Sequence, residues 1–123
     1  MDRISQITSP DLFTSLCQHL FVEEYYDFQA IDDSGGDAGN DGYSAKQGTL
    51  FQLYCPEKPN KINDAKYKIK IKNDLDKAKI LTESKNKQYN IKKWIFVTPS
   101  KLSEDVQTYI RIESKKRGFE GMS

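Results

Sequence analysis

The chain has 123 residues, of which 37% are hydrophobic and 30% are charged, a size and composition typical of one folded domain rather than of a disordered chain. No apolar run approaches the length of a membrane span, and residues 1–10 carry no signal-peptide pattern. We therefore expect a cytoplasmic domain without a membrane anchor.

The net charge is only +1, but it is unevenly distributed along the chain. Residues 1–56 hold two basic and nine acidic residues, a net charge of −7, whereas residues 57–93 hold twelve lysines and five acidic residues, a net charge of +7. An acidic third beside a basic third suggests a cation site next to a surface for a polyanion. Lysines that merely keep a helix face solvated would give the same distribution.

The first predicted helix runs from about Pro10 to Tyr25. It begins with Ser9-Pro10-Asp11, a capping residue followed by a proline at the first helical position and an acid in the first turn. Apolar residues recur at helical spacing and predict one buried face: Leu12, Phe13, Leu16, Cys17 and Leu20. Glu23 and Glu24 close the helix. Acids at this end are unfavourable to the helix dipole, which is a weak sign that one of them has another role.

A short predicted strand, residues 26–31, leads into a segment rich in glycine and aspartate, residues 32–42. Its composition is typical of turns. The segment is not a phosphate-binding P-loop, because no Gly-Lys-Ser/Thr follows it. It is not an EF-hand either, because Gly48 occupies the position of the acidic residue that closes an EF-hand loop. Residues 42–45 and 49–55 then predict a hairpin that turns through Gly48.

Side chains alternate between the two faces along the second hairpin strand. One face carries Leu50, Gln52 and Tyr54, and the other carries Phe51, Leu53 and Cys55. A buried glutamine among apolar residues must be hydrogen-bonded or must bind a ligand. Asp41 begins the neighbouring strand. A carboxylate and an amide oxygen on adjacent strands are the hard ligands that a cation such as Mg²⁺ prefers.

The lysine-rich segment after the hairpin fits two patterns. Tyr67 to Lys72 alternates as a strand would, whereas a helical face is marked by Tyr67, Ile71, Leu75, Ala78 and Thr82. We expect one long helix that begins near Asn63 and lets the strand before it lie parallel to a buried strand at 93–98. Ser103 is expected to cap a last helix, after which residues 118–123 begin a further strand or loop. The predicted fold is α/β, a mixed sheet flanked by helices.

This layout resembles the PD-(D/E)XK, or restriction-endonuclease-like, superfamily of nucleases. The shared features are a helix ending in an acid, a hairpin with Asp at the start of one strand and an acid or Gln on the next, a crossover helix, a strand and a helix. The matching positions are Glu24 (or Glu23), Asp41 and Gln52. The run FQLYCPEK also looks like the corresponding strand in nuclease-like domains at the N-terminus of bacterial anti-phage defence proteins. There, such domains precede an NTPase or sensor module.

The resemblance implies that Glu24, Asp41 and Gln52 bind Mg²⁺ or Mn²⁺, and it implies a lysine two positions after Gln52, where this chain has Tyr54. A phenol can donate a hydrogen bond but carries no positive charge. Three explanations stay open. A lysine has moved in sequence while staying near the site, and the candidates are Lys58, Lys66 and Lys70. Alternatively Tyr54 takes part of the role, or the site is inactive.

We therefore expect a single nuclease-like domain, residues 1–123, that forms the N-terminal part of a longer protein and acts as a metal-dependent DNA endonuclease effector in bacterial defence. Lys66, Lys68 and Lys72 would hold DNA phosphates without reading sequence. A homodimer would supply the two sites that cutting both strands requires. RNA is an alternative substrate for the same site. The main alternative function is a catalytically inactive nuclease-fold domain that binds nucleic acid or mediates protein assembly.

Overall fold

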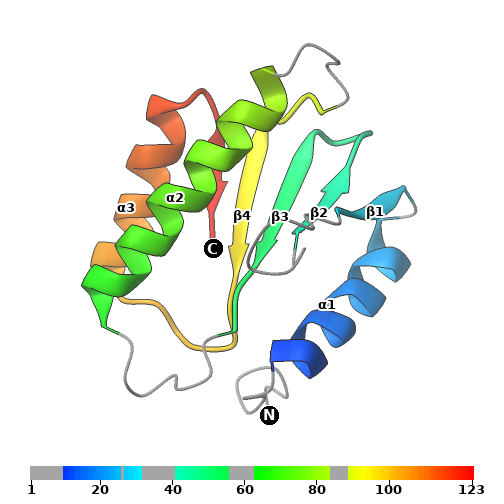
Figure 1. Ribbon diagram of the computed structural model, residues 1–123, viewed down its shortest axis with the longest axis horizontal. Coiled ribbons are helices and arrows are strands. Elements are labelled where there is room, and N and C mark those ends of the chain that lie inside the picture. Colours follow the sequence, from blue (N-terminus) through cyan, green and yellow to red (C-terminus); the bar gives the residue numbers. More distant parts are fainter. Residues whose placement is uncertain (1–9, 26, 32–40, 56–62, 84–88) are drawn as a thin grey trace.

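The protein is described by a computed structural model that covers residues 10–25, 27–31, 41–55, 63–83 and 89–123. In chain order its elements are α1 (Pro10–Glu24), β1 (Phe28–Ile31), β2 (Asp41–Ser44), β3 (Thr49–Leu53), α2 (Asp64–Glu83), β4 (Lys93–Val97), α3 (Glu104–Lys116) and β5 (Glu120–Met122). The strands form one sheet in the order β1-β2-β3-β4-β5 (Figure 1). The predicted α/β class with a mixed sheet is confirmed.

The sheet combines an antiparallel half and a parallel half. β1, β2 and β3 pair antiparallel, whereas β3, β4 and β5 run parallel. The α2 helix connects β3 to β4 and is the predicted crossover. Residues 67–72 are therefore helical, because the apolar spacing of four residues outweighs the alternating pattern.

The structure contains the helix caps and the turn glycine that the sequence predicted. Asn63 caps α2, since its Oδ1 accepts a hydrogen bond of 2.9 Å from the Lys66 backbone N–H. Ser103 caps α3 by accepting a hydrogen bond of 3.2 Å from the Val106 backbone N–H. Gly48 adopts a φ of 63°, the left-handed conformation that the β2–β3 turn needs. The predicted Ser9 cap and the glycine-rich segment 32–40 lie outside the described residues.

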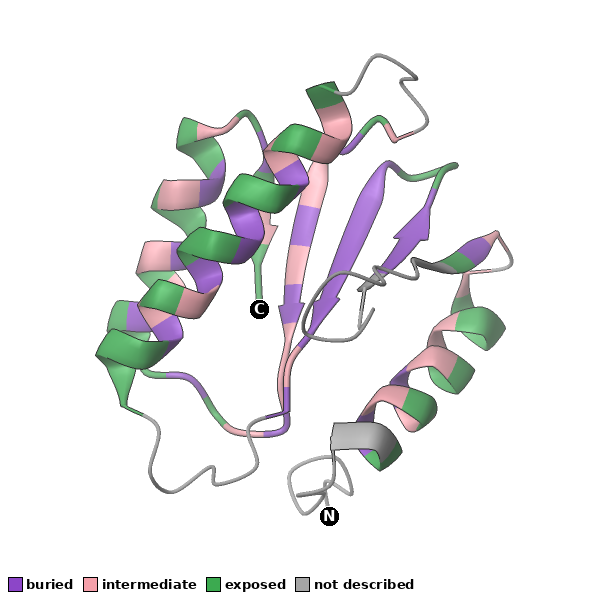
Figure 2. Ribbon diagram, in the orientation of Figure 1, coloured by how far each residue is buried: buried purple, intermediate pink, exposed green. Residues whose placement is uncertain are grey.

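Helices cover both faces of the sheet, so β3 is buried on both sides. The larger core cluster joins one sheet face, through Leu50, Trp94 and Phe96, to α2 and α3. The smaller cluster joins the other face to α1. Figure 2 shows the buried stripes of α2 and α3 turned toward the central strands.

The predicted apolar face of α1 is partly wrong. Phe13 and Cys17 are buried, and the Phe21 ring stacks on Phe51 with 4.5 Å between the ring centres. Leu12 and Leu20 are exposed. The packed stripe therefore has a spacing of four residues, which turns Leu12 and Leu20 toward solvent.

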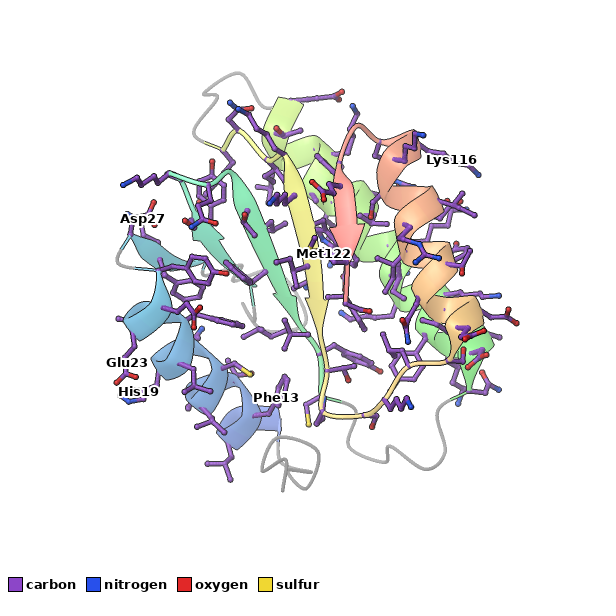
Figure 3. The ribbon with its side chains drawn as sticks, turned by 180° about the vertical axis from the view of Figure 1, so that it is seen from behind. Phe13, His19, Glu23, Asp27, Lys116 and Met122 are labelled. Atoms are coloured by element: carbon purple, nitrogen blue, oxygen red, sulfur yellow. The ribbon has the colours of Figure 1, made fainter. Side chains whose placement is uncertain are left out.

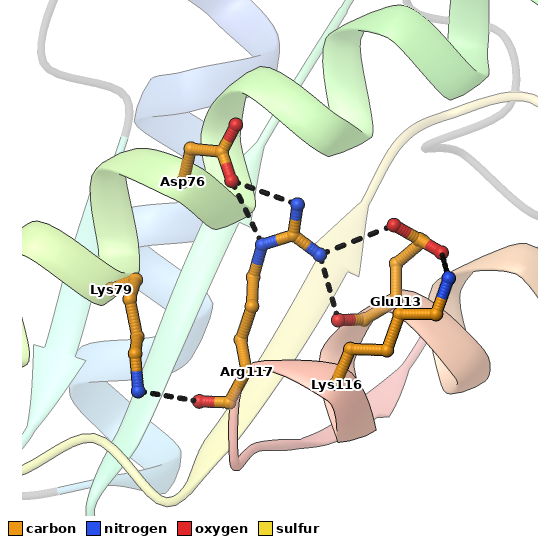
Figure 4. A network of polar contacts seen from close by, with 5 residues as sticks. All are labelled: Asp76, Lys79, Glu113, Lys116 and Arg117. Carbon is orange, nitrogen blue, oxygen red and sulfur yellow. Dashed lines mark hydrogen bonds and ion pairs between the residues drawn. The ribbon is translucent and has the colours of Figure 1, made fainter.

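A polar network joins α2 to the end of α3 (Figure 4). The Arg117 guanidinium bonds Asp76 Oδ1 through Nε at 2.9 Å and Nη2 at 2.8 Å, and its Nη1 donates to the Glu113 backbone carbonyl at 2.9 Å. Lys79 Nζ donates to the Arg117 carbonyl at 3.3 Å. These contacts bind one flank of α2 to the C-terminal end of α3. No helix in the described part is long and apolar enough to cross a membrane.

Candidate functional site

The two strands of the hairpin bring Asp41 and Gln52 together. In the β2–β3 register Asp41 lies directly opposite Gln52. Residues that are opposite each other in an antiparallel pair belong to the same face of the sheet. The backbone register therefore places residues 41 and 52, the two predicted ligand positions, side by side on neighbouring strands. The side chain of Asp41 itself lies outside the described part.

Gln52 belongs to the face that α2 covers. Leu50 and Tyr54, two residues before and after it, pack in the core cluster that contains Tyr67 and Ile71 of α2. Gln52 is only 6% exposed. The predicted alternation of side chains along β3 is confirmed, and the glutamine is a buried polar group between the sheet and α2.

A lysine from α2 reaches the residue that stands where the resemblance implies a lysine. The Nζ of Lys70 lies 5.2 Å from the centre of the Tyr54 ring, which is within the range of a cation–π interaction. The same ring packs edge-on against Tyr67 with 6.1 Å between centres. Of the candidate lysines, Lys70 is the one that the described contacts place beside Tyr54.

The ammonium of Lys70 is also paired with Asp74, one helical turn further along α2. Nζ lies 3.3 Å from Oδ1 and 3.2 Å from Oδ2 of Asp74. The Asp74 side chain is 3% exposed and that of Lys70 is 18% exposed. A buried carboxylate that is paired with a half-buried cation is costly to desolvate, so such pairs often mark functional positions.

The flank of α2 that carries this pair differs from the flank that meets α3. Lys68, Asp76 and Lys79 contact residues of α3 or its C-terminal end. Lys70 and Asp74 contact each other instead, and the Lys70 ammonium also contacts the Tyr54 ring. The ion pair therefore lies beside Tyr54, the residue that follows the end of β3 and stands two positions after Gln52.

Glu24 occupies a different part of the fold. It is the exposed last residue of α1, the helix that packs on Phe51 and Leu53. Those residues belong to the face opposite to that of Gln52. Its alternative, Glu23, is exposed and lies 3.4 Å from His19 on the outer side of α1 (Figure 3). The structure does not bring either glutamate next to Gln52, and their role as metal ligands stays a prediction.

The remaining predicted lysines have distinct environments. Lys66 and Lys72 are exposed on α2, whereas Lys68 is half-buried with its Nζ 5.6 Å from the centre of the Tyr109 ring. Lys66 precedes Lys70 by one turn and so lies on the same flank as the ion pair. Lys58 lies outside the described residues.

No cluster of three or more His, Cys, Asp or Glu side chains suited to a metal ion occurs among the side chains that the structure describes. Both cysteines are buried, Cys17 within α1 and Cys55 in the core cluster that packs against it. Burial, together with the nearby Cys55, raises the pKa of the Cys17 thiol to about 11, and burial also raises the pKa of Cys55. Neither thiol is suited to act as a nucleophile.

Sequence reasoning missed Asp74. It lies next to the apolar helical face of Tyr67, Ile71, Leu75 and Ala78, and a single acid at its margin is ordinarily solvated. The spacing of Lys70 and Asp74, four residues apart, was the signal that could have indicated a pair. No protein-family model, curated protein or solved structure matches the chain. Any function assigned to this site therefore depends on its own geometry and chemistry.

Proposed function

We propose that the chain is a metal-dependent nuclease domain of the restriction-endonuclease-like type, which hydrolyses phosphodiester bonds in DNA. The observation that carries the proposal is the pairing of Asp41 with Gln52 on the sheet face where Lys70 of α2 meets Tyr54. The role as a cytoplasmic effector of a larger bacterial defence protein follows from the resemblance of the sequence and is part of the same proposal.

The residues at this place fit a hard divalent cation. Asp41 supplies a carboxylate, and Gln52 is a buried amide whose oxygen is an uncharged hard ligand. Bound Mg²⁺ or Mn²⁺ would polarise the phosphate and lower the pKa of a coordinated water. Glu24 is left out of the proposed ligand set, because α1 packs on the other face of the sheet.

Lys70 supplies the charge that Tyr54 lacks. Its ammonium lies against the ring of Tyr54, which follows the end of β3 and stands two residues after Gln52. A positive charge held at that position stabilises the negative charge that develops on a phosphate as it is attacked. The exposed Lys66, one turn before it, extends the positive surface away from the site and suits a phosphate of the DNA backbone.

A second candidate function is favoured by one observation. The charge of Lys70 is already balanced by Asp74 at 3.2 Å, which reduces its availability to a phosphate. A DNA-binding domain without catalysis would have the same lysine surface and the same fold. The two candidates differ in whether the protein cleaves DNA in a reaction that needs metal and Asp41, or binds DNA without cleaving it.

Cleavage of supercoiled plasmid tests the proposal. Purified protein is incubated with plasmid and with Mg²⁺, Mn²⁺ or EDTA, and the nicked fraction is followed over time. The wild type is expected to nick with metal only, and Asp41→Ala to be inactive. Gln52→Glu keeps an oxygen ligand and is expected to retain cleavage, whereas Gln52→Ala loses it.

Gln47→Ala, at an exposed position in the β2–β3 turn, serves as the control and should match the wild type. Thermal melting of each variant shows whether a loss of activity reflects unfolding. Absence of metal-dependent nicking in the wild type, or equal nicking by Asp41→Ala, would leave only the binding function. A parallel assay on single-stranded and duplex RNA decides between DNA and RNA as substrate.

A further inference from the structure

Asp74 is a buried acid beside an otherwise apolar helix face. The buried residues of α2 are Tyr67, Ile71, Asp74, Leu75 and Ala78. Removing a carboxylate from water is unfavourable unless a partner compensates for it. An apolar side chain at this position would serve the packing of α2 on the sheet equally well. Core packing alone therefore does not explain why this position holds an aspartate.

The ammonium of Lys70, the partner of Asp74, has two contacts that hold it in place. The Lys70 ammonium lies within 3.3 Å of both Asp74 oxygens, and it lies 5.2 Å from the centre of the Tyr54 ring. A lysine has a flexible stem and many rotamers when it is exposed. Here the Asp74 carboxylate and the Tyr54 ring both contact the ammonium, which limits the rotamers that Lys70 can adopt.

A second pair on the same helix shows that the spacing alone does not require this arrangement. Lys79 and Glu83 are also four residues apart, with 3.0 Å between Nζ and Oε1, but their side chains are 42% and 60% exposed. Such a pair is solvated and contributes little. The Lys70–Asp74 pair differs in its burial and in its place beside Tyr54.

We propose that Asp74 is a positioning residue, which holds the Lys70 ammonium at Tyr54 in the orientation that the site uses. The proposal rests on the proposed nuclease function and adds a residue to it. Asp74 contacts Lys70, and it acts on the substrate only through that lysine. Removal of the carboxylate would take away the charged partner that lies within 3.3 Å of the Lys70 ammonium.

Whether the Lys70–Asp74 pair also stabilises the fold can be tested separately. Buried ion pairs can often be replaced by apolar residues without loss of stability. The double variant Lys70→Met with Asp74→Leu is therefore expected to keep its melting temperature while it loses cleavage. Because this variant removes Lys70 itself, its melting temperature tests only whether the pair stabilises the fold, and cleavage by Asp74→Asn tests the role of Asp74.

The experiment compares nicking rates of Asp74→Asn, Lys70→Met and the double variant Lys70→Met with Asp74→Asn, with Glu83→Gln as the matched control. Asp74→Asn keeps the shape of the side chain and is expected to lower the rate roughly tenfold to a hundredfold, the usual effect of losing a residue that orients another functional group. The double variant should be as slow as Lys70→Met alone, because Asp74 acts through Lys70. Glu83→Gln should match the wild type.

Two results would overturn the inference while the nuclease function stands. One is wild-type cleavage by Asp74→Asn. The other concerns the double variant Lys70→Met with Asp74→Asn. If it is slower than Lys70→Met by the full factor seen for Asp74→Asn, Asp74 acts independently of Lys70. An inactive wild type would remove both proposals.

The Lys70 ammonium gives a readout that does not need activity. Its side-chain ¹⁵N signal is expected to show slow proton exchange in the wild type and in Glu83→Gln, and to lose that protection in Asp74→Asn. Equal protection in Asp74→Asn would show that Asp74 does not hold the lysine.

Discussion

The ammonium of Lys70 lies 5.2 Å from the centre of the Tyr54 ring, although the two residues belong to different elements and are separated by the whole connection from β3 to α2. The residue that follows β3 is a tyrosine at the position where the resemblance implied a lysine. The crossover helix brings a positive charge to that same side chain from above the sheet.

The first prediction concerns the ring of Tyr54. Tyr54→Phe keeps the ring that contacts Lys70, Tyr67 and Phe96, whereas Tyr54→Leu removes it. We expect Tyr54→Leu to lower the free energy of unfolding by about 1–2 kcal/mol more than Tyr54→Phe does, the sum of a cation–π contact and aromatic pairs. Urea denaturation measures the difference. Equal stability of the two variants would show that the ring does not hold Lys70.

The second prediction concerns the lysines of α2 and DNA affinity. Lys66 lies in the first turn of α2, where a positive charge is unfavourable to the helix dipole, and on the flank that carries Lys70. Lys66→Glu should therefore weaken DNA binding without loss of stability. It should also lower the slope of log affinity against log salt by about 1, as expected for one lost phosphate contact.

Lys72→Glu is the internal comparison for this prediction. Lys72 is exposed as well but lies six residues further along, on the side of α2 that faces away from the site. We expect a smaller effect on affinity in fluorescence anisotropy titrations at several salt concentrations. A larger loss with Lys72→Glu would place the DNA on the α3 side of α2.

The third prediction concerns the contact between α3 and β5. A Cβ added at Gly121 would lie 2.5 Å from Ser114 Cβ and 2.7 Å from the Ile110 carbonyl oxygen. Gly121→Ala should therefore destabilise the fold by about 1–3 kcal/mol, as overpacking does. Chemical denaturation measures this loss.

Gly118 separates packing from backbone strain. Its φ is 84°, and nothing lies within 4 Å of an added Cβ. Asparagine tolerates this conformation better than alanine, so Gly118→Asn should be milder than Gly118→Ala. At Gly121 the order should reverse, because a larger side chain clashes more. The same order at both positions would contradict the packing explanation.

The fourth prediction concerns Asp27 and acid stability. Its Oδ2 accepts a hydrogen bond of 2.7 Å from the Lys46 backbone N–H, and its Oδ1 accepts one of 2.8 Å from Ser44 Oγ. These bonds, the one from Lys46 first, lower the pKa of the Asp27 carboxyl below its ordinary 3.8. The carboxylate ties the start of β1 to the β2–β3 turn.

A folded-state pKa below the unfolded value stabilises the fold above the unfolded pKa, and this contribution is lost as the pH falls through the folded pKa. Asp27→Asn should be less stable than the wild type at pH 7, and the difference should shrink as the pH falls below 3.8. Melting temperatures measured from neutral to acid pH give the comparison. Parallel curves for the two proteins would rule out this role of Asp27.

The sequence by itself determined the elements and the faces of β3. Caps such as Asn63 and Ser103 act on the backbone within their own first turn, and alternation along a strand follows from backbone geometry. The pairing of Asp41 with Gln52 was within reach for the same reason, because a short hairpin sets its own register. Such signals need no knowledge of distant residues.

Only the tertiary structure decided which helix covers which face of the sheet, and therefore which charged residues lie beside Tyr54. The α1 helix packs on the face of Phe51, which separates Glu24 from Gln52. The packing of α2 against α3 and the sheet fixes its rotation, and in this rotation Asp74 is buried and Lys70 contacts Tyr54. A helical pattern identifies the buried stripe, but only packing against a neighbour decides whether a charged residue at the margin of that stripe faces water or becomes part of a site.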